Sequence, residues 1–237
     1  MQRAVRLRPA MARARLKVFS FTTTEEVALT SFDWRDQIHV VARHQGNCES
    51  CTAFAVAAAI ELAAIIAKRA VRIPVGYFHT CIGHPGNADA DQICGSGVDL
   101  SYMLGAIRDD GFPSNAPDSY PFPANRCGMG GARFKLKSFD EITSVTNAKT
   151  AIRSGPILAD MEVTKKFFDF KGRIYRQPDA STTTLHTVCI IGFNSTGWII
   201  LNSMGRSWGD GTGCATVPYG TGFILDPKVR QAYSLSL

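Results

Sequence analysis

The chain lacks any apolar run long enough to cross a membrane. Its most apolar stretch, residues 53–67, spans 15 residues and carries Glu61 near its middle, whereas a membrane-spanning helix needs about 20 predominantly apolar residues. Internal repeats and low-complexity tracts are also missing from the sequence, so a repeat architecture is not expected. We therefore predict no transmembrane anchor and interpret residues 53–67 as part of a buried central helix.

Acidic residues are absent from the first 17 positions, which hold six basic ones: Arg3, Arg6, Arg8, Arg13, Arg15 and Lys17. The whole chain has 26 Lys and Arg against 20 Asp and Glu, a formal net charge of +6. Without this segment the remainder is formally neutral. We therefore expect no nucleic-acid partner for the folded part, and a nucleic-acid binder, which would rest on this segment alone, ranks last among the candidate functions.

The same segment lacks the apolar core of a secretory signal, so we predict no signal peptide. A transit-like segment or a basic arm stays open, although the simplest interpretation of residues 1–31 is a loosely docked extension. The rest of the chain has the composition of a globular protein, with 45% hydrophobic and 19% charged residues among 237. That length suits one domain or two small lobes that share a cleft.

Helical patterns precede strand patterns along the chain. Helices are expected at residues 50–68, 98–110 and 146–153, and residues 77–97 are expected to form a loop. Strands are expected at residues 157–163, 186–193, 198–201 and 214–217. This order favours an α+β fold with two lobes.

A cysteine stands where the first expected helix begins. The segment Gln45-Gly46-Asn47-Cys48-Glu49-Ser50-Cys51 runs directly into the helix-forming residues 52–61. The unpaired N–H groups of a helix start lower the pKa of a thiol and favour the nucleophilic thiolate. Gln45, six residues earlier, can place an amide donor beside the sulfur. A thiolate with an amide donor is the start of an acyl-transfer site, and it requires a histidine.

One histidine suits that role. His186 lies 135 residues after Cys51, in the β-branched, apolar stretch 185–193, and the following apolar run ends at Asn202. The other histidines lack such a context and are expected to be structural or exposed: His39, His44, His79 and His84. The chain order of cysteine, histidine and asparagine is that of papain-type peptidases.

The motifs resemble the papain (C1) family of cysteine peptidases. The matching segments run from about Phe32 to the end of the chain: Asp33-Trp34-Arg35, Gln45-Gly46, Cys48, Ser50-Cys51, Ala53-Phe54, His186, Asn202-Ser203, Gly205 and Trp208-Gly209. The tail at 217–227 looks more like bacterial members. The resemblance implies a papain-like α+β fold over residues 32–237. A helical lobe (about 45–128) and a β-barrel-like lobe (about 129–237 plus 32–44) would then flank the active-site cleft.

The resemblance also implies a thiol protease, a hydrolase without a cofactor or metal. Cys51 would attack the scissile carbonyl and form an acyl-enzyme, and His186 would act as acid and base. Asn202 would orient the His186 imidazole, and Gln45 with the Cys51 N–H would form the oxyanion hole. Trp208 would shield the bond between His186 and Asn202.

By the same resemblance, a set of residues is expected to bind substrate: Glu49, Ser96, Gly97, Val98, Asp99, Asp160, Thr187 and Trp208. Val98, Asp99, Asp160 and Thr187 would line the pocket for the second residue before the cut, where two carboxylates would favour a basic side chain. Several positions depart from the family pattern. Glu49 replaces a glycine, Thr52 and Met204 each replace a tryptophan, and Leu185 replaces the aspartate common before the histidine. The usual glycine pair appears as Ser96-Gly97.

The seven cysteines leave at least one thiol free. The resemblance implies disulfides Cys48–Cys94 and Cys81–Cys127, with Cys51 free, and Cys189 and Cys214 are expected to stay reduced. Zinc is the competing chemistry, since Cys48-x-x-Cys51 and His79-x-Cys81-x-x-His84 contain ligand spacings. Zinc binding would consume Cys51 and leave His186 unexplained. Disulfides suggest a secreted or periplasmic protein, which conflicts with the missing signal peptide, so the compartment stays open.

The expected partners are protein or peptide substrates, and the chain is expected to be a monomer. Because only about 31 residues precede the mature-like start, a short N-terminal segment in or near the cleft is a hypothesis. Two alternatives keep the same fold: a catalytically altered or inactive binding module, and an acyl transferase or peptide ligase that uses the same triad.

Overall fold

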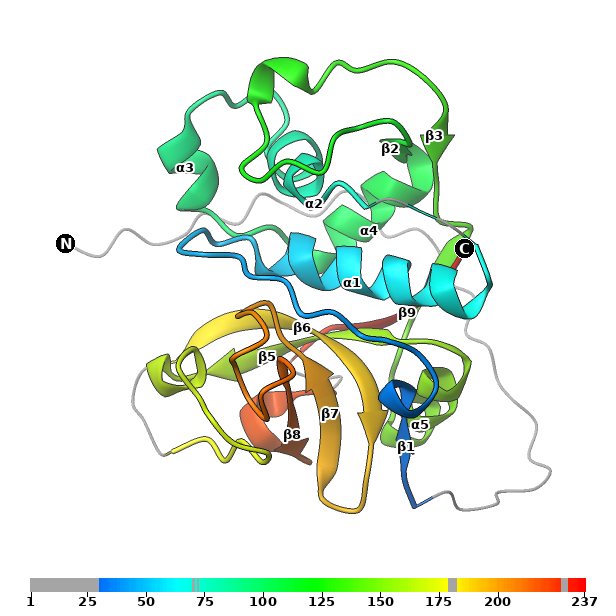
Figure 1. Ribbon diagram of the computed structural model, residues 1–237, viewed down its shortest axis with the longest axis vertical. Helices are drawn as coiled ribbons and strands as arrows, with labels where there is room; N and C mark the ends of the chain where they lie inside the picture. Colours follow the sequence, from blue (N-terminus) through cyan, green and yellow to red (C-terminus); the bar gives the residue numbers. More distant parts are fainter. Residues whose placement is uncertain (1–29, 70, 72, 179–182, 227–229) are drawn as a thin grey trace.

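The computed structural model describes residues 30–69, 71, 73–178, 183–226 and 230–237. The expectations about the basic N-terminal segment therefore fall outside the described residues. Figure 1 shows two lobes, with the first four α-helices in one and a curved sheet in the other. This arrangement has the α+β, two-lobe form that the sequence predicts.

Helix α1 (Cys51–Ile66) is the structural centre of the first lobe. Ten of its 16 residues are buried, so most of the helix surface packs against protein, and the helix lies between the other helices and the sheet (Figure 1). Alanine is its commonest residue, which combines high helix propensity with a thin profile that lets neighbouring elements approach closely. The prediction of a buried central helix is correct.

The prediction of a loop over residues 77–97 is wrong. The structure has α2 (Val75–Tyr77), a π-helical segment η2 (Phe78–Gly83) and α3 (Ala90–Cys94) there. Buried Phe78 packs against Phe112 with ring centroids 4.9 Å apart, and the Asp89 carboxylate caps α3. Tertiary packing and a local cap therefore order a stretch whose composition resembles a loop.

Helix α4 (Leu100–Asp109) ends at a glycine, as expected. Gly111 has φ +68°, and a Cβ there would lie 2.2 Å from the Phe134 carbonyl oxygen, so only glycine fits. The approaching backbone belongs to a two-stranded ribbon of β2 (Phe112–Pro113) and β3 (Arg133–Phe134). This ribbon keeps residues 133–134 beside the helical lobe.

The second lobe is an antiparallel sheet in the order β4-β9-β5-β6-β7-β8, with β1 paired to β6. Four strands were predicted: β5 (Ile157–Val163), β6 (Thr184–Phe193), β7 (Gly197–Leu201) and β8 (Cys214–Pro218). Three short strands were not: β1 (Phe32–Asp33), β4 (Ser138–Glu141) and β9 (Ala232–Ser236). Helix α5 (Val145–Ser154) was predicted within one residue at each end. The missed strands are short and pair with distant segments, so local patterns do not reveal them.

The sheet separates two hydrophobic cores. Alternate residues of β6 face opposite sides: Cys189 and Ile191 pack with α1, whereas Val188 and Ile190 pack inside the curved sheet with Trp198. Helix α1 therefore lies on the outer face of a barrel-like sheet, and its first turn meets β6 at the boundary of the lobes. No helix in the described parts of the chain could span a membrane.

Candidate active site

Cys51 is the first residue of α1. Its side chain is partly exposed, while Thr52 and Phe54, which follow it on the helix, are buried. The N-cap residue Ser50 makes no side-chain hydrogen bond to the first turn. The first-turn N–H groups thus remain directed past the sulfur, where they favour negative charge.

His186 reaches Cys51 from β6 across the lobe boundary. The imidazole is buried, and its Nε2 lies 2.8 Å from Asn202 Oδ1. The same oxygen accepts the Ser203 backbone N–H at 2.8 Å, which establishes which end of the carboxamide is oxygen. His186 Nε2 must then carry a hydrogen and donate it, so Nδ1 is the nitrogen that faces Cys51.

The two reactive groups shift each other's pKa. Burial opposes ionisation of Cys51, but the hydrogen bond and charge of His186 outweigh it, and the pKa of the thiol is lowered. Burial likewise opposes protonation of His186, but its hydrogen bond to Cys51, the Cys51 charge and the Asn202 bond raise the pKa of the imidazole. These opposite shifts favour a thiolate–imidazolium pair.

Gln45, the predicted oxyanion-hole donor, is held by several hydrogen bonds. The residue is buried, its Nε2 donates to the Cys48 carbonyl at 2.8 Å, and its Oε1 accepts from Ser203 Oγ at 2.5 Å. Its backbone oxygen also accepts from Tyr120 Oη at 2.8 Å. The Cys48 carbonyl engages one Nε2 hydrogen, and the amide carries a second hydrogen that could act as a donor.

Two phenylalanines contact the histidine, and Trp208 packs against one of them. Trp208 is buried and donates from Nε1 to the Phe167 carbonyl at 2.6 Å, and its ring packs in a tilted orientation against the Phe167 ring with centroids 5.0 Å apart. Phe167 and Phe168 contact the His186 ring with centroids 5.3 and 5.4 Å away. The sequence prediction missed this aromatic pair, and the one signal for it was two adjacent phenylalanines in an otherwise basic stretch.

Three of the predicted pocket residues are joined by hydrogen bonds. Thr187 Oγ1 lies 2.7 Å from a carboxylate oxygen of Asp160, its partner across β5 and β6. Thr52 Oγ1 lies 3.0 Å from Thr187 Oγ1 and 2.7 Å from the Val98 carbonyl. Asp160, Thr52 and Thr187 are buried. The sequence prediction did not include Thr52.

Four further residues of the predicted substrate-binding set lie at the protein surface. Glu49, Ser96, Gly97 and Asp99 are exposed. A Cβ on Gly97 would lie 4.0 Å from the Glu49 carbonyl oxygen, so these two positions are neighbours. The Asp99 carboxylate caps α4 by accepting the Tyr102 N–H at 2.8 Å. Asp99 therefore has a local structural task besides any contact with substrate.

Two disulfides join Cys48 to Cys94 and Cys81 to Cys127, the pairs that the resemblance implies. Cys51, Cys189 and Cys214 are free. Of the three cysteines in the predicted zinc-ligand spacings, Cys48 and Cys81 are in disulfides. The third, Cys51, interacts with His186. Among the described residues, Cys48, His79 and Cys94 bring potential metal-ligand atoms within 4.8 Å of one another. Cys48 and Cys94 are bonded to each other in a disulfide.

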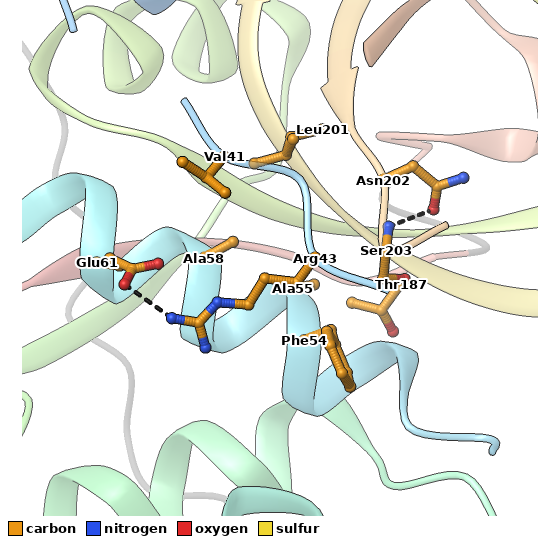
Figure 2. Close-up of a pocket in the computed structure, with 10 residues that line it drawn as sticks. All are labelled: Val41, Arg43, Phe54, Ala55, Ala58, Glu61, Thr187, Leu201, Asn202 and Ser203. Atoms are coloured by element: carbon orange, nitrogen blue, oxygen red, sulfur yellow. Dashed lines mark hydrogen bonds and ion pairs between the residues drawn. The ribbon is translucent and has the colours of Figure 1, made fainter. Parts of the chain in front are cut away.

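A small cavity lies behind the site, between α1 and the sheet. Its volume is about 20 Å³, and its lining includes Thr187, Asn202 and Ser203, so it has room for about one water molecule. Figure 2 shows an ion pair between Arg43 and Glu61 along it, at 2.9 Å. The cavity is too small for a substrate side chain.

Comparisons with known proteins agree with this geometry. The papain family cysteine protease model matches residues 28–221. Two solved structures, both described as complexes with E-64, share the fold. A Carica candamarcensis cysteine protease has a TM-score of 0.69 at 20% identity, over 88% of this chain and 98% of its own. Bromelain from Ananas comosus has a TM-score of 0.67 at 18% identity, over 89% of this chain and 100% of bromelain.

Among curated relatives, mouse cathepsin R is 30% identical over 198 residues, 75% of this chain and 57% of its own length. Mouse cathepsin O is 30% identical over 192 residues, which cover 75% of this chain and 59% of the length of cathepsin O. The chain thus spans less than two thirds of the cathepsins it matches. These relatives are eukaryotic, so the expected similarity to bacterial members is not supported. The fold class is confirmed, and the chain belongs to the papain family of cysteine proteases.

Proposed function

We propose that the chain is a cysteine endopeptidase. The observation that carries the proposal is the Cys51–His186 pair, with its lowered thiol pKa and raised imidazole pKa. The thiolate attacks the scissile carbonyl carbon and forms an S–C bond. The imidazolium then gives its proton to the leaving nitrogen as the C–N bond breaks. A water that loses a proton to His186 then attacks the acyl carbon, and the S–C bond breaks.

Two further residues support these steps. Asn202 accepts from His186 Nε2 and keeps Nδ1 directed at the sulfur. Gln45 Nε2 and the Cys51 backbone N–H donate to the oxygen that becomes negative in the tetrahedral intermediate. The four residues come from one chain, so the site needs no second subunit, and we propose that the protein works as a monomer. Light scattering that gave a dimer mass would contradict this.

Labelling tests the proposed function. A peptidyl epoxide or diazomethyl ketone is expected to add one equivalent to Cys51, found by mass spectrometry of peptides, because a thiolate opens such reagents. Cys51→Ala is the matched control and is expected to take up none. Absence of an adduct on folded wild type, with residues 1–30 removed, would favour the inactive binding module instead.

The same labelling tests the hypothesis that the N-terminal segment lies in or near the cleft. Residues 1–29 are outside the described part of the chain, so this hypothesis rests on the sequence. If the segment occupies the cleft, deleting residues 1–30 raises the rate of epoxide labelling. An unchanged rate would contradict it.

We further propose that the pocket for the second residue before the cut accepts a basic side chain. Successive hydrogen bonds link Asp160 to Thr187, Thr187 to Thr52 and Thr52 to the Val98 carbonyl. Burial raises the pKa of Asp160, and the charge of Asp99 raises it as well. The negative charge of Asp99 therefore disfavours ionisation of Asp160. A Lys or Arg side chain brought by substrate would relieve this repulsion.

A peptide library at pH 7.5 tests this specificity. Arg and Lys are expected to be preferred over Leu and Phe by about tenfold at the second residue before the cut, a typical effect of one partly buried ion pair. Asp160→Asn is expected to remove most of that preference. Asp36→Asn, which removes an exposed acid elsewhere, is the control. A wild-type preference for large apolar residues would refute the proposal.

A further inference from the structure

Four oxygen atoms from four segments form a continuous line next to the catalytic pair. They belong to the Asp160 carboxyl on β5, the Thr187 hydroxyl on β6, the Thr52 hydroxyl on α1 and the Val98 carbonyl before α4. The successive separations are 2.7, 3.0 and 2.7 Å. All three side chains are at most 7% exposed, so water does not readily replace these contacts. We refer to this line as the oxygen chain.

The oxygen chain needs one hydrogen more than its threonines supply. Its three contacts each require a hydrogen, whereas the hydroxyls of Thr52 and Thr187 provide two and the Val98 carbonyl provides none. If Asp160 is ionised, one contact is left with lone pairs facing each other in the protein interior, which is unfavourable. If Asp160 is protonated, it donates to Thr187, Thr187 donates to Thr52, and Thr52 donates to Val98.

The oxygen chain is joined directly to the catalytic residues. Thr52 follows Cys51 on α1, and Thr187 follows His186 on β6. The Thr187 backbone also lowers the pKa of Cys51. A bond between the two threonine hydroxyls therefore holds the helix start that carries the nucleophile against the strand that carries the histidine.

We propose that Asp160 is a positioning residue that acts in its protonated form. The neutral carboxyl completes the oxygen chain and keeps Cys51 and His186 aligned, and ionisation removes one of the three bonds and loosens that alignment. This inference rests on the proposed peptidase function, and it deepens it by making the site's competence depend on one proton outside the catalytic pair.

The surroundings of Asp160 agree with a carboxyl that keeps its proton in mild acid. The pKa of Asp160 is raised to about 6, mainly by burial and also by the charge of Asp99. The Thr187 hydrogen bond lowers it in part. The charges of His186 and Arg230 lower it. The titratable groups that interact with Asp160 thus come from each neighbouring element: Cys51 on α1, Asp99 at α4, His186 on β6, and Arg230 and Tyr233 at β9.

The decisive experiment follows the Asp160 carboxyl by carbon-13 NMR of aspartate-labelled full-length protein, with the resonance assigned by its loss in Asp160→Asn. In wild type it is expected to titrate near pH 6. In Thr52→Val it is expected to titrate about one pH unit lower, a tenfold change in the ionisation constant. Without the Thr52 hydroxyl, Thr187 is free to donate to the ionised carboxylate. Thr80→Val, a buried threonine outside the oxygen chain, is expected to behave as wild type.

The pH profile of kcat provides the functional readout. Wild-type kcat is expected to fall about tenfold as pH rises through the pKa of Asp160, because misalignment of reacting groups is costly. Asp160→Asn, whose amide can still donate to Thr187, is expected to lose this step. An unchanged carboxyl titration in Thr52→Val would overturn the proposal, as would a wild-type kcat that does not follow the carboxyl. If the carboxyl shifts as stated but no variant cleaves peptide at any pH, the oxygen chain stands and the proposed function fails.

Discussion

Replacing His186 by alanine is expected to lower kcat/KM by about 10⁴- to 10⁶-fold, the usual loss when one member of a catalytic unit is removed. The His186 hydrogen bond and charge are what lower the pKa of Cys51 against the opposing effect of burial. Without them burial dominates, and the pKa of the thiol rises above its ordinary value. The variant thus loses both its proton donor and its thiolate.

The pH dependence of Cys51 alkylation by iodoacetamide separates these two losses. In wild type the thiolate is expected to persist into acidic solution, because its pKa is lowered. In His186→Ala the alkylation rate is expected to rise only at alkaline pH. His39→Ala, which removes an exposed histidine, is the matched control. An acidic alkylation plateau retained in His186→Ala would show that another group stabilises the thiolate.

Replacing Gln45 by alanine is expected to reduce kcat by about 10²- to 10³-fold with a small change in KM, since an oxyanion-hole donor stabilises the transition state by about 2.7–4 kcal/mol. The Gln45 amide also bonds Cys48 and Ser203, so a loss of folding must be told apart from a loss of catalysis. Iodoacetamide makes that distinction, because alkylation of Cys51 forms no oxyanion.

Gln45→Ala is therefore expected to be alkylated at nearly the wild-type rate while it turns over peptide slowly. Gln37→Ala, which changes an exposed glutamine in the same segment, is expected to keep wild-type kcat. If Gln45→Ala retained near-normal turnover, the oxyanion-hole assignment would be wrong. If alkylation and turnover fell together, the role of Gln45 would be to hold the helix start in place.

Sequence alone predicts the parts of this protein that depend on local pattern. The helix that carries Cys51 and the strand that carries His186 have strong local propensities. The elements that were missed depend on distant partners: β9 lies between β4 and β5, and η2 is held by the packing of Phe78. No local pattern encodes these pairings.

The same distinction applies within the site. The order of Cys51, His186 and Asn202 along the chain was sufficient to select them from the sequence. Thr52 and Phe168 were not predicted as site residues, because each is recognisable only by a contact with a separate element. Thr52 contacts the Thr187 hydroxyl, and Phe168 contacts the His186 ring. A threonine in a helix or a phenylalanine after a short turn has no sequence signal of that kind.

The state of the cysteines has a consequence for oxidative damage. Burial raises the pKa of Cys189 and raises that of Cys214 to about 11, so neither offers a thiolate to peroxide. Cys51 alone combines partial exposure with a lowered pKa. Its nearest cysteine in sequence, Cys48, is already bonded to Cys94, so a sulfenic acid on Cys51 finds no resolving thiol there. Recovery from oxidation therefore depends on a small thiol supplied by the surroundings.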